Sequence, residues 1–157
     1  MMQRRIVYTV LTAIVIALAL GLRSHSSEAA ASAGSTIALN ADSSIVSSLN
    51  LTVGQRVAFE LTVTNNTRKR IEIRFPNGKT HDFVVLDAAG REVWRWSEGK
   101  MFTQVLQNKS VEPGQSITFS ESWKNPDASG TFTAVARLWS RNYPIEQRAL
   151  LVIPERR

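Results

Sequence analysis

Apolar and polar residues alternate with a period of two along most of the chain from about residue 44 onward. Such alternation is typical of β-strands that bury one face and expose the other. It is clearest in residues 57–64, where Val57, Phe59 and Leu61 alternate with small or polar neighbours. The pattern predicts about eight short strands, which include residues 57–64, 71–75, 81–87, 91–96, 116–123, 131–139 and 147–153.

Turn-forming residues separate the predicted strands, as in residues 65–67 (Asn-Asn-Thr), 76–78 (Pro-Asn-Gly) and 113–114 (Pro-Gly). No long segment of the domain has the 3.6-residue period of an amphipathic helix. Short strands at regular spacing therefore predict an all-β, immunoglobulin-like antiparallel β-sandwich, with a closed barrel as the alternative. Residues 101–107 fit either one helical turn or a short irregular strand.

The best-defined local structure is a hairpin predicted for residues 81–96. Asp87 takes the first turn position, where its carboxylate can accept hydrogen bonds from the backbone N–H groups that follow. Gly90 takes the fourth position, where a positive φ is tolerated. The segment therefore predicts a type I turn closed by a glycine bulge.

Residues 1–31 have the composition of an export leader. Arg4 and Arg5 precede an uncharged, mostly apolar stretch at residues 6–22, which we expect to be helical. Arg23 and a stretch rich in Ser and Ala follow it. A positive flank, an apolar middle and a tail of small residues form the three-part pattern of an export signal.

The leader has two interpretations. It is either a signal peptide cleaved at small residues near positions 29–33, or an uncleaved anchor whose two arginines stay inside. Both interpretations place the domain outside the cytoplasm, as a periplasmic, secreted or membrane-anchored protein. The predicted organisation is a leader at 1–31, a flexible Ser/Ala-rich spacer at 32–43 and the β-sandwich domain at 44–157.

Composition narrows the chemistry that the domain can perform. The chain has no cysteine, which excludes disulfides, thiol nucleophiles, Cys-ligated zinc and iron–sulfur clusters. The exported domain must therefore rely on packing for its stability. Because a Cys-Trp-Cys pattern is also absent, the sandwich would be immunoglobulin-like only in a loose sense.

The basic charge of the chain does not indicate nucleic-acid binding. The formal net charge is +6, and three of the basic residues flank the leader. The densest run, Arg68-Lys69-Arg70, lies between a predicted turn and a predicted strand. It has neither the aromatic partners nor a recognised motif of a nucleic-acid surface, so we interpret it as a solvated hairpin end. A membrane contact is expected only through the leader, if it is uncleaved.

Catalytic patterns are missing from the sequence. His81 is the only imidazole of the domain, and although Asp82 stands beside it, no serine has a Gly-x-Ser-x-Gly context. No His, Asp or Glu residues have the spacing of metal ligands, and no glycine-rich phosphate loop is present. We therefore expect no enzyme activity, no catalytic residues, no metal site and no cofactor.

The segment from residue 93 to residue 102 is the most distinctive part of the chain. Trp94 and Trp96 have the same parity, so on a strand both side chains project from one face. They form either a wall of the hydrophobic core or a recognition ridge for a partner. The loop at residues 97–101 is the better candidate for binding, because loops carry function on a rigid scaffold. The candidate partner-binding residues are Trp94, Arg95, Trp96, Ser97, Lys100, Met101 and Phe102.

The same region resembles a known protein family. The resemblance rests on residues 82–87 (Asp-Phe-Val-Val-Leu-Asp), 90–97 (Gly-Arg-Glu-Val-Trp-Arg-Trp-Ser) and 102–104 (Phe-Thr-Gln), with Pro113-Gly114 and Trp123 further on. These residues are similar to the signature of the intracellular proteinase inhibitor family, BsuPI, over roughly residues 53–138. The resemblance implies an immunoglobulin-like sandwich and a proteinase-binding role.

Two functions follow as hypotheses. The first is an exported, non-catalytic proteinase inhibitor or proteinase-binding domain, for which Arg95, Lys100 and Met101 are the possible specificity side chains. The second is a scaffold or adhesion module of the cell envelope that binds protein or glycan. The leader, the spacer and the lack of catalytic patterns fit both hypotheses, and the resemblance favours the first.

Overall fold

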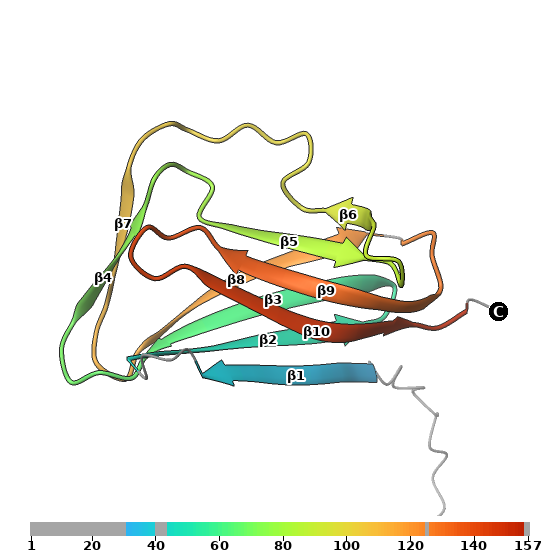
Figure 1. Cartoon of the computed structure of the whole chain (residues 1–157), viewed down its shortest axis with the longest axis horizontal. Coiled ribbons are helices and arrows are strands. Elements are labelled where there is room, and N and C mark those ends of the chain that lie inside the picture. The colour runs from blue at the N-terminus through green and yellow to red at the C-terminus, as the bar shows by residue number, and fades with distance from the viewer. Residues whose placement is uncertain (1–30, 40–43, 125, 156–157) are drawn as a thin grey trace, which may run out of the picture.

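The computed structural model describes residues 31–39, 44–124 and 126–155, and it shows these residues as strands and connecting loops (Figure 1). The described residues form ten strands: β1 (Ala31–Leu39), β2 (Ile45–Val53), β3 (Arg56–Asn65), β4 (Ile71–Phe75), β5 (His81–Leu86), β6 (Glu92–Arg95), β7 (Gln107–Val111), β8 (Ser116–Lys124), β9 (Gly130–Leu138) and β10 (Ile145–Ile153). The all-β prediction is confirmed. No helix long and apolar enough to span a membrane occurs among the described residues.

Two antiparallel sheets form the body of the domain. One has the strand order β1-β2-β3-β8 and the other has the order β10-β9-β5-β6 (Figure 1). The described strands therefore form a sandwich of two separate sheets, and the alternative of one closed sheet does not hold. Strands β5 and β9 are neighbours although they are distant in sequence, and so are β3 and β8, so each sheet contains one long-range pair beside pairs of consecutive strands.

The core lies between the sheets and contains the residues that alternate in the sequence. Phe59 and Leu61 on β3 face Phe83 and Val85 on β5, and all four are at most 1% exposed. Strand β10 alternates buried and exposed residues along its whole length. Strands β2, β3 and β10 each bury one face, which is the arrangement that a period of two predicts.

Strands β4 and β7 form a separate two-stranded ribbon at one end of the sandwich, on the left of Figure 1. Strand β7 was not predicted, and residues 101–106 are neither helix nor strand. Three consecutive residues of β7 are exposed, so its sequence has no period of two. The basic residues 68–70 lie in an exposed bend, but that bend is not a hairpin end, because β4 pairs with β7 and not with β3.

Residues 32–39 of the predicted spacer lie in strand β1. Strand β1 pairs with β2 in antiparallel register, from Ala31 opposite Val53 to Leu39 opposite Val46. A β-ladder is made by backbone groups, so a segment rich in Ser, Ala and Gly can still add an edge strand. The predicted leader helix lies outside the described residues.

The β5–β6 hairpin follows its predicted turn chemistry. The Asp87 carboxylate Oδ1 accepts hydrogen bonds from the backbone N of Ala89 and of Arg91, each at 2.9 Å. Gly90 N donates to the Asp87 carbonyl oxygen at 2.9 Å, and Gly90 has a φ of +77°. The register shifts next to Leu86, as expected for a bulge. The hairpin places the end of β6 beside β5, where the candidate site begins.

Candidate functional site

The candidate functional site is the segment that connects β6 to β7. We call residues 96–106 the β6–β7 loop. Its first part is a turn in which Lys100 N donates to the Ser97 carbonyl oxygen at 3.2 Å, and Gly99 has a φ of +69°. A glycine adopts this backbone conformation without strain. After the turn, the chain runs without regular secondary structure along the upper edge of Figure 1 to the start of β7.

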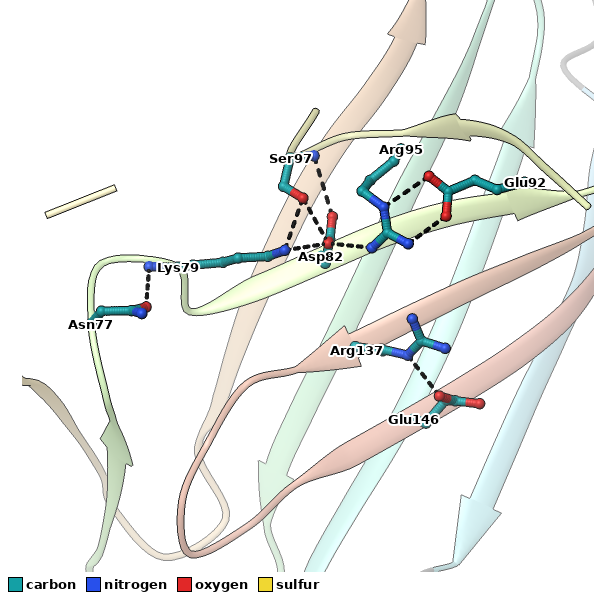
Figure 2. A network of polar contacts seen from close by, with 8 residues as sticks. All are labelled: Asn77, Lys79, Asp82, Glu92, Arg95, Ser97, Arg137 and Glu146. Carbon is teal, nitrogen blue, oxygen red and sulfur yellow. Dashed lines mark hydrogen bonds and ion pairs between the residues drawn. The ribbon is translucent and has the colours of Figure 1, made fainter. Parts of the chain in front are cut away.

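A buried carboxylate holds the start of the loop, as Figure 2 shows. The side chain of Asp82 on β5 is 0% exposed, and its Oδ2 accepts hydrogen bonds from Arg95 Nη1 at 2.9 Å and Ser97 Oγ at 2.7 Å. Lys79 Nζ lies 2.6 Å from the same oxygen and also donates to Ser97 Oγ at 2.8 Å. Asp82 therefore ties three segments together: the turn before β5, the end of β6 and the start of the β6–β7 loop.

The charges of this network favour its ionised form. Burial raises the pKa of the Asp82 carboxyl, but hydrogen bonds from Lys79, Ser97 and Arg95 outweigh burial and hold the pKa below its usual value. Arg95 also bonds to Glu92. The bond to Glu92, and then the bond to Asp82, raise the pKa of the Arg95 guanidinium although burial opposes this. The Asp82 carboxylate is therefore ionised at neutral pH and paired with Lys79 and Arg95.

Aromatic contacts hold the middle of the loop. The ring of Trp96 stacks on His81, with centroids 4.4 Å apart, and contacts the Phe102 ring at 5.7 Å. The Lys100 ammonium lies 4.1 Å from the Trp96 ring centroid, within the range of a cation–π interaction. The contact between Trp96 and Phe102 thus brings the two ends of residues 97–101 together. The Lys100 ammonium packs on the Trp96 ring.

A backbone contact fixes the chain just after Phe102. Gly78 N donates to the Thr103 carbonyl oxygen at 2.8 Å. A Cβ atom on Gly78 would lie 2.6 Å from Thr103 Oγ1 and 3.2 Å from Thr103 N, so the close approach requires a glycine at position 78. The turn at residues 76–78, which the sequence marks as a break between strands, therefore serves as a support for the β6–β7 loop.

Apolar side chains project from the loop between and beyond these supports. Met101 is 98% exposed, and Val105 and Leu106 are 67% and 64% exposed. These are three of the seven large hydrophobic residues that are exposed in the described part of the chain. Exposed apolar side chains that gather in one segment are typical of a surface that binds another protein.

The structure separates the seven predicted partner-binding residues into two groups. Trp94 stacks on Phe59 at 5.1 Å and on Trp123 at 5.7 Å, so Trp94 and Trp96 both pack against the hydrophobic core. This agrees with the core-wall interpretation of the two tryptophans. The contacts described above also hold Arg95, Ser97, Lys100 and Phe102. Met101 differs from the other six, because nearly all of its surface faces solvent.

Val105 and Leu106 are exposed residues of the site that the sequence analysis did not select. They follow Phe102 in the segment for which no secondary structure could be decided. The available signal was that apolar residues at 101, 105 and 106 fit neither a strand period nor a long helix. Apolar residues without a period indicate a segment whose side chains are not all directed into one core.

His81 contacts Glu121 and Thr80 beneath the Trp96 ring. Its Nε2 lies 3.2 Å from Glu121 Oε1 across the sandwich, and its Nδ1 lies 3.1 Å from Thr80 Oγ1. Burial lowers the pKa of His81 below its usual value of 6.5, and the hydrogen bond with Glu121 opposes this effect only in part. Within residues 31–39, 44–124 and 126–155, no group of three or more His, Cys, Asp or Glu side chains could hold a metal ion. The arrangement is a packing contact beneath Trp96.

Several solved structures are similar to this chain at low sequence identity. The putative ApaA protein of Bordetella pertussis is 14% identical, with 79% of this chain and 97% of that chain covered and a TM-score of 0.37. The yjhA protein of Bacillus subtilis is 18% identical, with 67% and 90% covered and a TM-score of 0.34. A β-glucosidase of Erythrobacter marinus is 17% identical over 62% of this chain, which spans only 13% of that enzyme, with a TM-score of 0.32. No curated protein matches the sequence.

A family comparison gives a match over more than half of the chain. The family described as intracellular proteinase inhibitor, BsuPI, matches residues 46–143. The match begins in β2, ends just before β10 and includes the whole β6–β7 loop. It also contains the Asp82 network, Trp96 and Gly78, which hold the loop. The resemblance identified from residues 82–104 is thereby confirmed, and the chain belongs to the BsuPI family of intracellular proteinase inhibitors.

Proposed function

We propose that this protein is a non-catalytic proteinase-binding domain that acts outside the cytoplasm and inhibits its target through the β6–β7 loop. The observation that carries the proposal is the contrast within that loop. Its backbone is held by the Asp82 network, by Trp96 and by Gly78, whereas Met101 is 98% exposed. The membership in an inhibitor family supplies the class of partner.

A rigid exposed loop is a favourable shape for binding a proteinase. A flexible segment must be ordered when it binds, and the loss of conformational freedom weakens the complex. The Asp82 network, Trp96 and Gly78 hold residues 96–103 to the domain, so we expect these residues to need little ordering when a partner binds. Binding therefore retains more of the free energy gained from contacts with the exposed apolar side chains.

The site of action is proposed from the N-terminal sequence. Residues 1–31 have the three-part pattern of an export signal, and the domain needs no reducing environment because it has no cysteine. Export would place this protein outside the compartment that the family's description, intracellular proteinase inhibitor, names. Its target would then be a proteinase of the envelope or the surroundings.

A titration of proteinases with the purified protein tests the proposal. The protein is expressed from the full-length sequence, recovered and added in increasing amounts to serine, cysteine and metalloproteinases with small reporter substrates. We expect a stoichiometric loss of activity for one class of proteinase. No inhibition of any class at micromolar protein, with the domain shown to be folded and uncleaved, would contradict the proposal and favour the envelope scaffold.

Cell fractionation tests the proposed location. An epitope tag at the C-terminus reports where the protein accumulates and whether its mass corresponds to loss of residues 1–31. We expect the protein in the extracytoplasmic or membrane fraction, with a mass that distinguishes cleavage from anchoring. Accumulation of the full-length protein in the cytoplasm would contradict the proposed export.

A further inference from the structure

Three side chains near the start of the β6–β7 loop have the length to enter a specificity pocket of a proteinase: Arg95, Lys100 and Met101. Such a pocket selects one side chain of a bound segment, and an acidic pocket selects a cation whereas a hydrophobic pocket selects an apolar residue. The surroundings of the three side chains therefore decide which kind of proteinase the loop fits. The argument that follows rests on the proposed function.

Arg95 is committed to the interior network. Its guanidinium bonds to the buried Asp82 carboxylate and to Glu92, and its side chain is 27% exposed. Entry into a pocket would require Arg95 to leave both carboxylates. The carboxylate of Asp82 would then lose one of its two cations while its side chain remains 0% exposed, which is unfavourable for a buried charge. Arg95 is a positioning residue of the loop.

Lys100 is an exposed residue, but its ammonium contacts the domain. Its Nζ lies 4.1 Å from the centroid of the Trp96 ring, and Trp96 packs against the core through His81. The ammonium is therefore directed back onto the domain. A lysine that enters an acidic pocket must instead point away from its own domain.

Met101 has the opposite orientation. It is 98% exposed, and it directly precedes Phe102 and Thr103, whose ring and backbone are held by Trp96 and Gly78. The backbone at Met101 thus lies between a turn on one side and a fixed anchor on the other. This combination presents an unrestrained side chain from a restrained backbone, which is the requirement for a residue that inserts into a pocket.

We propose that Met101 is the primary specificity residue of this inhibitor and that its target is a proteinase with a hydrophobic specificity pocket. The unbranched thioether side chain fills apolar pockets of varied shape and gains free energy when it leaves water. An acidic pocket would gain no partner from Met101 and would bury an unpaired carboxylate. The protein therefore discriminates against proteinases that cleave after Lys or Arg.

Substitutions at position 101 test this assignment in the full-length protein. Each variant is titrated against chymotrypsin and subtilisin, which accept apolar side chains, and against trypsin, whose pocket is acidic. We expect the unmodified protein to inhibit at least one of the first two and not trypsin. Met101→Lys is expected to weaken that inhibition on the order of 100-fold and to give measurable inhibition of trypsin, and Met101→Ala to weaken it on the order of 30-fold. Met101→Leu is expected to stay within about 10-fold of the unmodified protein.

A matched control uses another exposed apolar residue. Leu150 on β10 is 61% exposed and lies outside the β6–β7 loop. Leu150→Lys should leave inhibition of every proteinase unchanged. Because both residues are exposed, neither substitution should change the unfolding transition, which circular dichroism monitors in each variant.

The outcomes separate this inference from the proposed function. Inhibition by the unmodified protein that is unchanged in Met101→Ala and Met101→Lys would overturn the assignment of Met101 and leave the proposed function intact. Inhibition of trypsin alone by the unmodified protein would overturn the apolar pocket. A folded protein that inhibits none of the wider proteinase panel would overturn the proposed function itself, and the specificity of Met101 with it.

Discussion

Ser97 Oγ donates a hydrogen bond to the buried carboxylate of Asp82 at 2.7 Å and so joins the start of the β6–β7 loop to strand β5. Lys79 and Arg95 bind the same carboxylate oxygen, at 2.6 Å and 2.9 Å. The two cations are about a quarter exposed, whereas the carboxylate is fully buried. Asp82 is therefore the residue on which this network depends.

Removal of the charge at position 82 should destabilise the domain. We expect Asp82→Asn to lower the free energy of unfolding by about 2 kcal/mol, because the amide keeps the shape but loses charge-assisted hydrogen bonds at a buried site. Urea denaturation measures the change. Glu92→Gln is the control, because Glu92 contacts Arg95 at a site that is 40% exposed and should change stability by less than about 1 kcal/mol. Equal effects of the two substitutions would show that burial of Asp82 does not matter.

Removal of the Trp96 ring should lower the stability of the domain and increase the mobility of the β6–β7 loop. Trp96→Ala is expected to lower stability by about 3 kcal/mol, because Trp96 packs against the core and against Phe102. The amides of residues 98–103 should exchange their hydrogens faster. Trp139→Ala is the control, since Trp139 is 44% exposed and should change stability by about 1 kcal/mol or less. Unchanged exchange in the loop would contradict the role of Trp96 as its support.

The Trp96 indole also allows a finer test. Its Nε1 is buried and has no hydrogen-bond partner among the described residues. Trp96→Phe removes this unpaired donor and keeps an aromatic ring, so it should destabilise the domain less than Trp96→Ala. A loss of stability in Trp96→Phe as large as in Trp96→Ala would mean that the Phe ring does not replace the packing of the indole.

The contact between Gly78 and Thr103 should appear in a double-mutant cycle. Gly78→Ala is expected to lower stability by about 2 kcal/mol, because its Cβ would lie 2.6 Å from Thr103 Oγ1. Thr103→Ala removes that oxygen, so the double variant should lose less stability than the sum of the two single variants. Chemical denaturation of all four proteins measures the coupling. Additive losses would indicate that the clash is with the backbone at Thr103 N, at 3.2 Å, and not with the side chain.

The stability of the domain should fall as the pH drops below 6.5. Burial lowers the pKa of His81 from that value, so the unfolded chain binds a proton in a range of pH in which the folded protein does not. Protonation therefore favours the unfolded state, and stability is lost as the pH falls from 6.5 towards the lower pKa of the folded state. Urea midpoints at pH 7.5 and 5.5 measure the loss. His81→Asn should show a smaller difference between the two values, and an equal difference would assign the effect to other groups.

Val105 and Leu106 should extend the binding surface beyond Met101. Both are more than 60% exposed in the same loop. Replacing both with Ser should weaken inhibition by about 10-fold without changing the unfolding midpoint, because the substitutions remove apolar contacts with the partner and none with the core. Inhibition kinetics and thermal unfolding of the double variant measure the two effects. A changed midpoint with unchanged inhibition would place these residues in the folded core and outside the interface.

Local patterns predicted most of the sandwich because the relevant physics is local. The alternation in residues 57–64 reappears as β3, and the Asp87 and Gly90 signals reappear as the turn of the β5–β6 hairpin. A period of two and a turn that requires Asp or Gly depend only on residues close together in the chain. The buried and exposed faces of these strands could therefore be assigned without knowledge of the rest of the fold.

Strands β1 and β7 could not be predicted in the same way. Strand β7 has three consecutive exposed residues, and its one neighbour in the described sheets is β4. Strand β1 consists mainly of small or hydroxyl residues and lies at a sheet edge beside β2. Both segments are strands because a neighbouring strand offers unpaired backbone groups. The residue pattern of the two segments does not indicate where that neighbour lies.

The sequence by itself determined the fold class, the family and the region that carries the candidate site. Periodicity, turn residues and the run at residues 82–104 can all be recognised from the order of the residues alone. Only the tertiary structure decided among Arg95, Lys100 and Met101. The direction of the two cationic side chains depends on partners from other segments: Asp82 of β5 holds the Arg95 guanidinium, and the Trp96 ring, stacked on His81, holds the Lys100 ammonium. Met101 remains accessible because the contacts on both sides of it hold the backbone and leave its side chain in solvent.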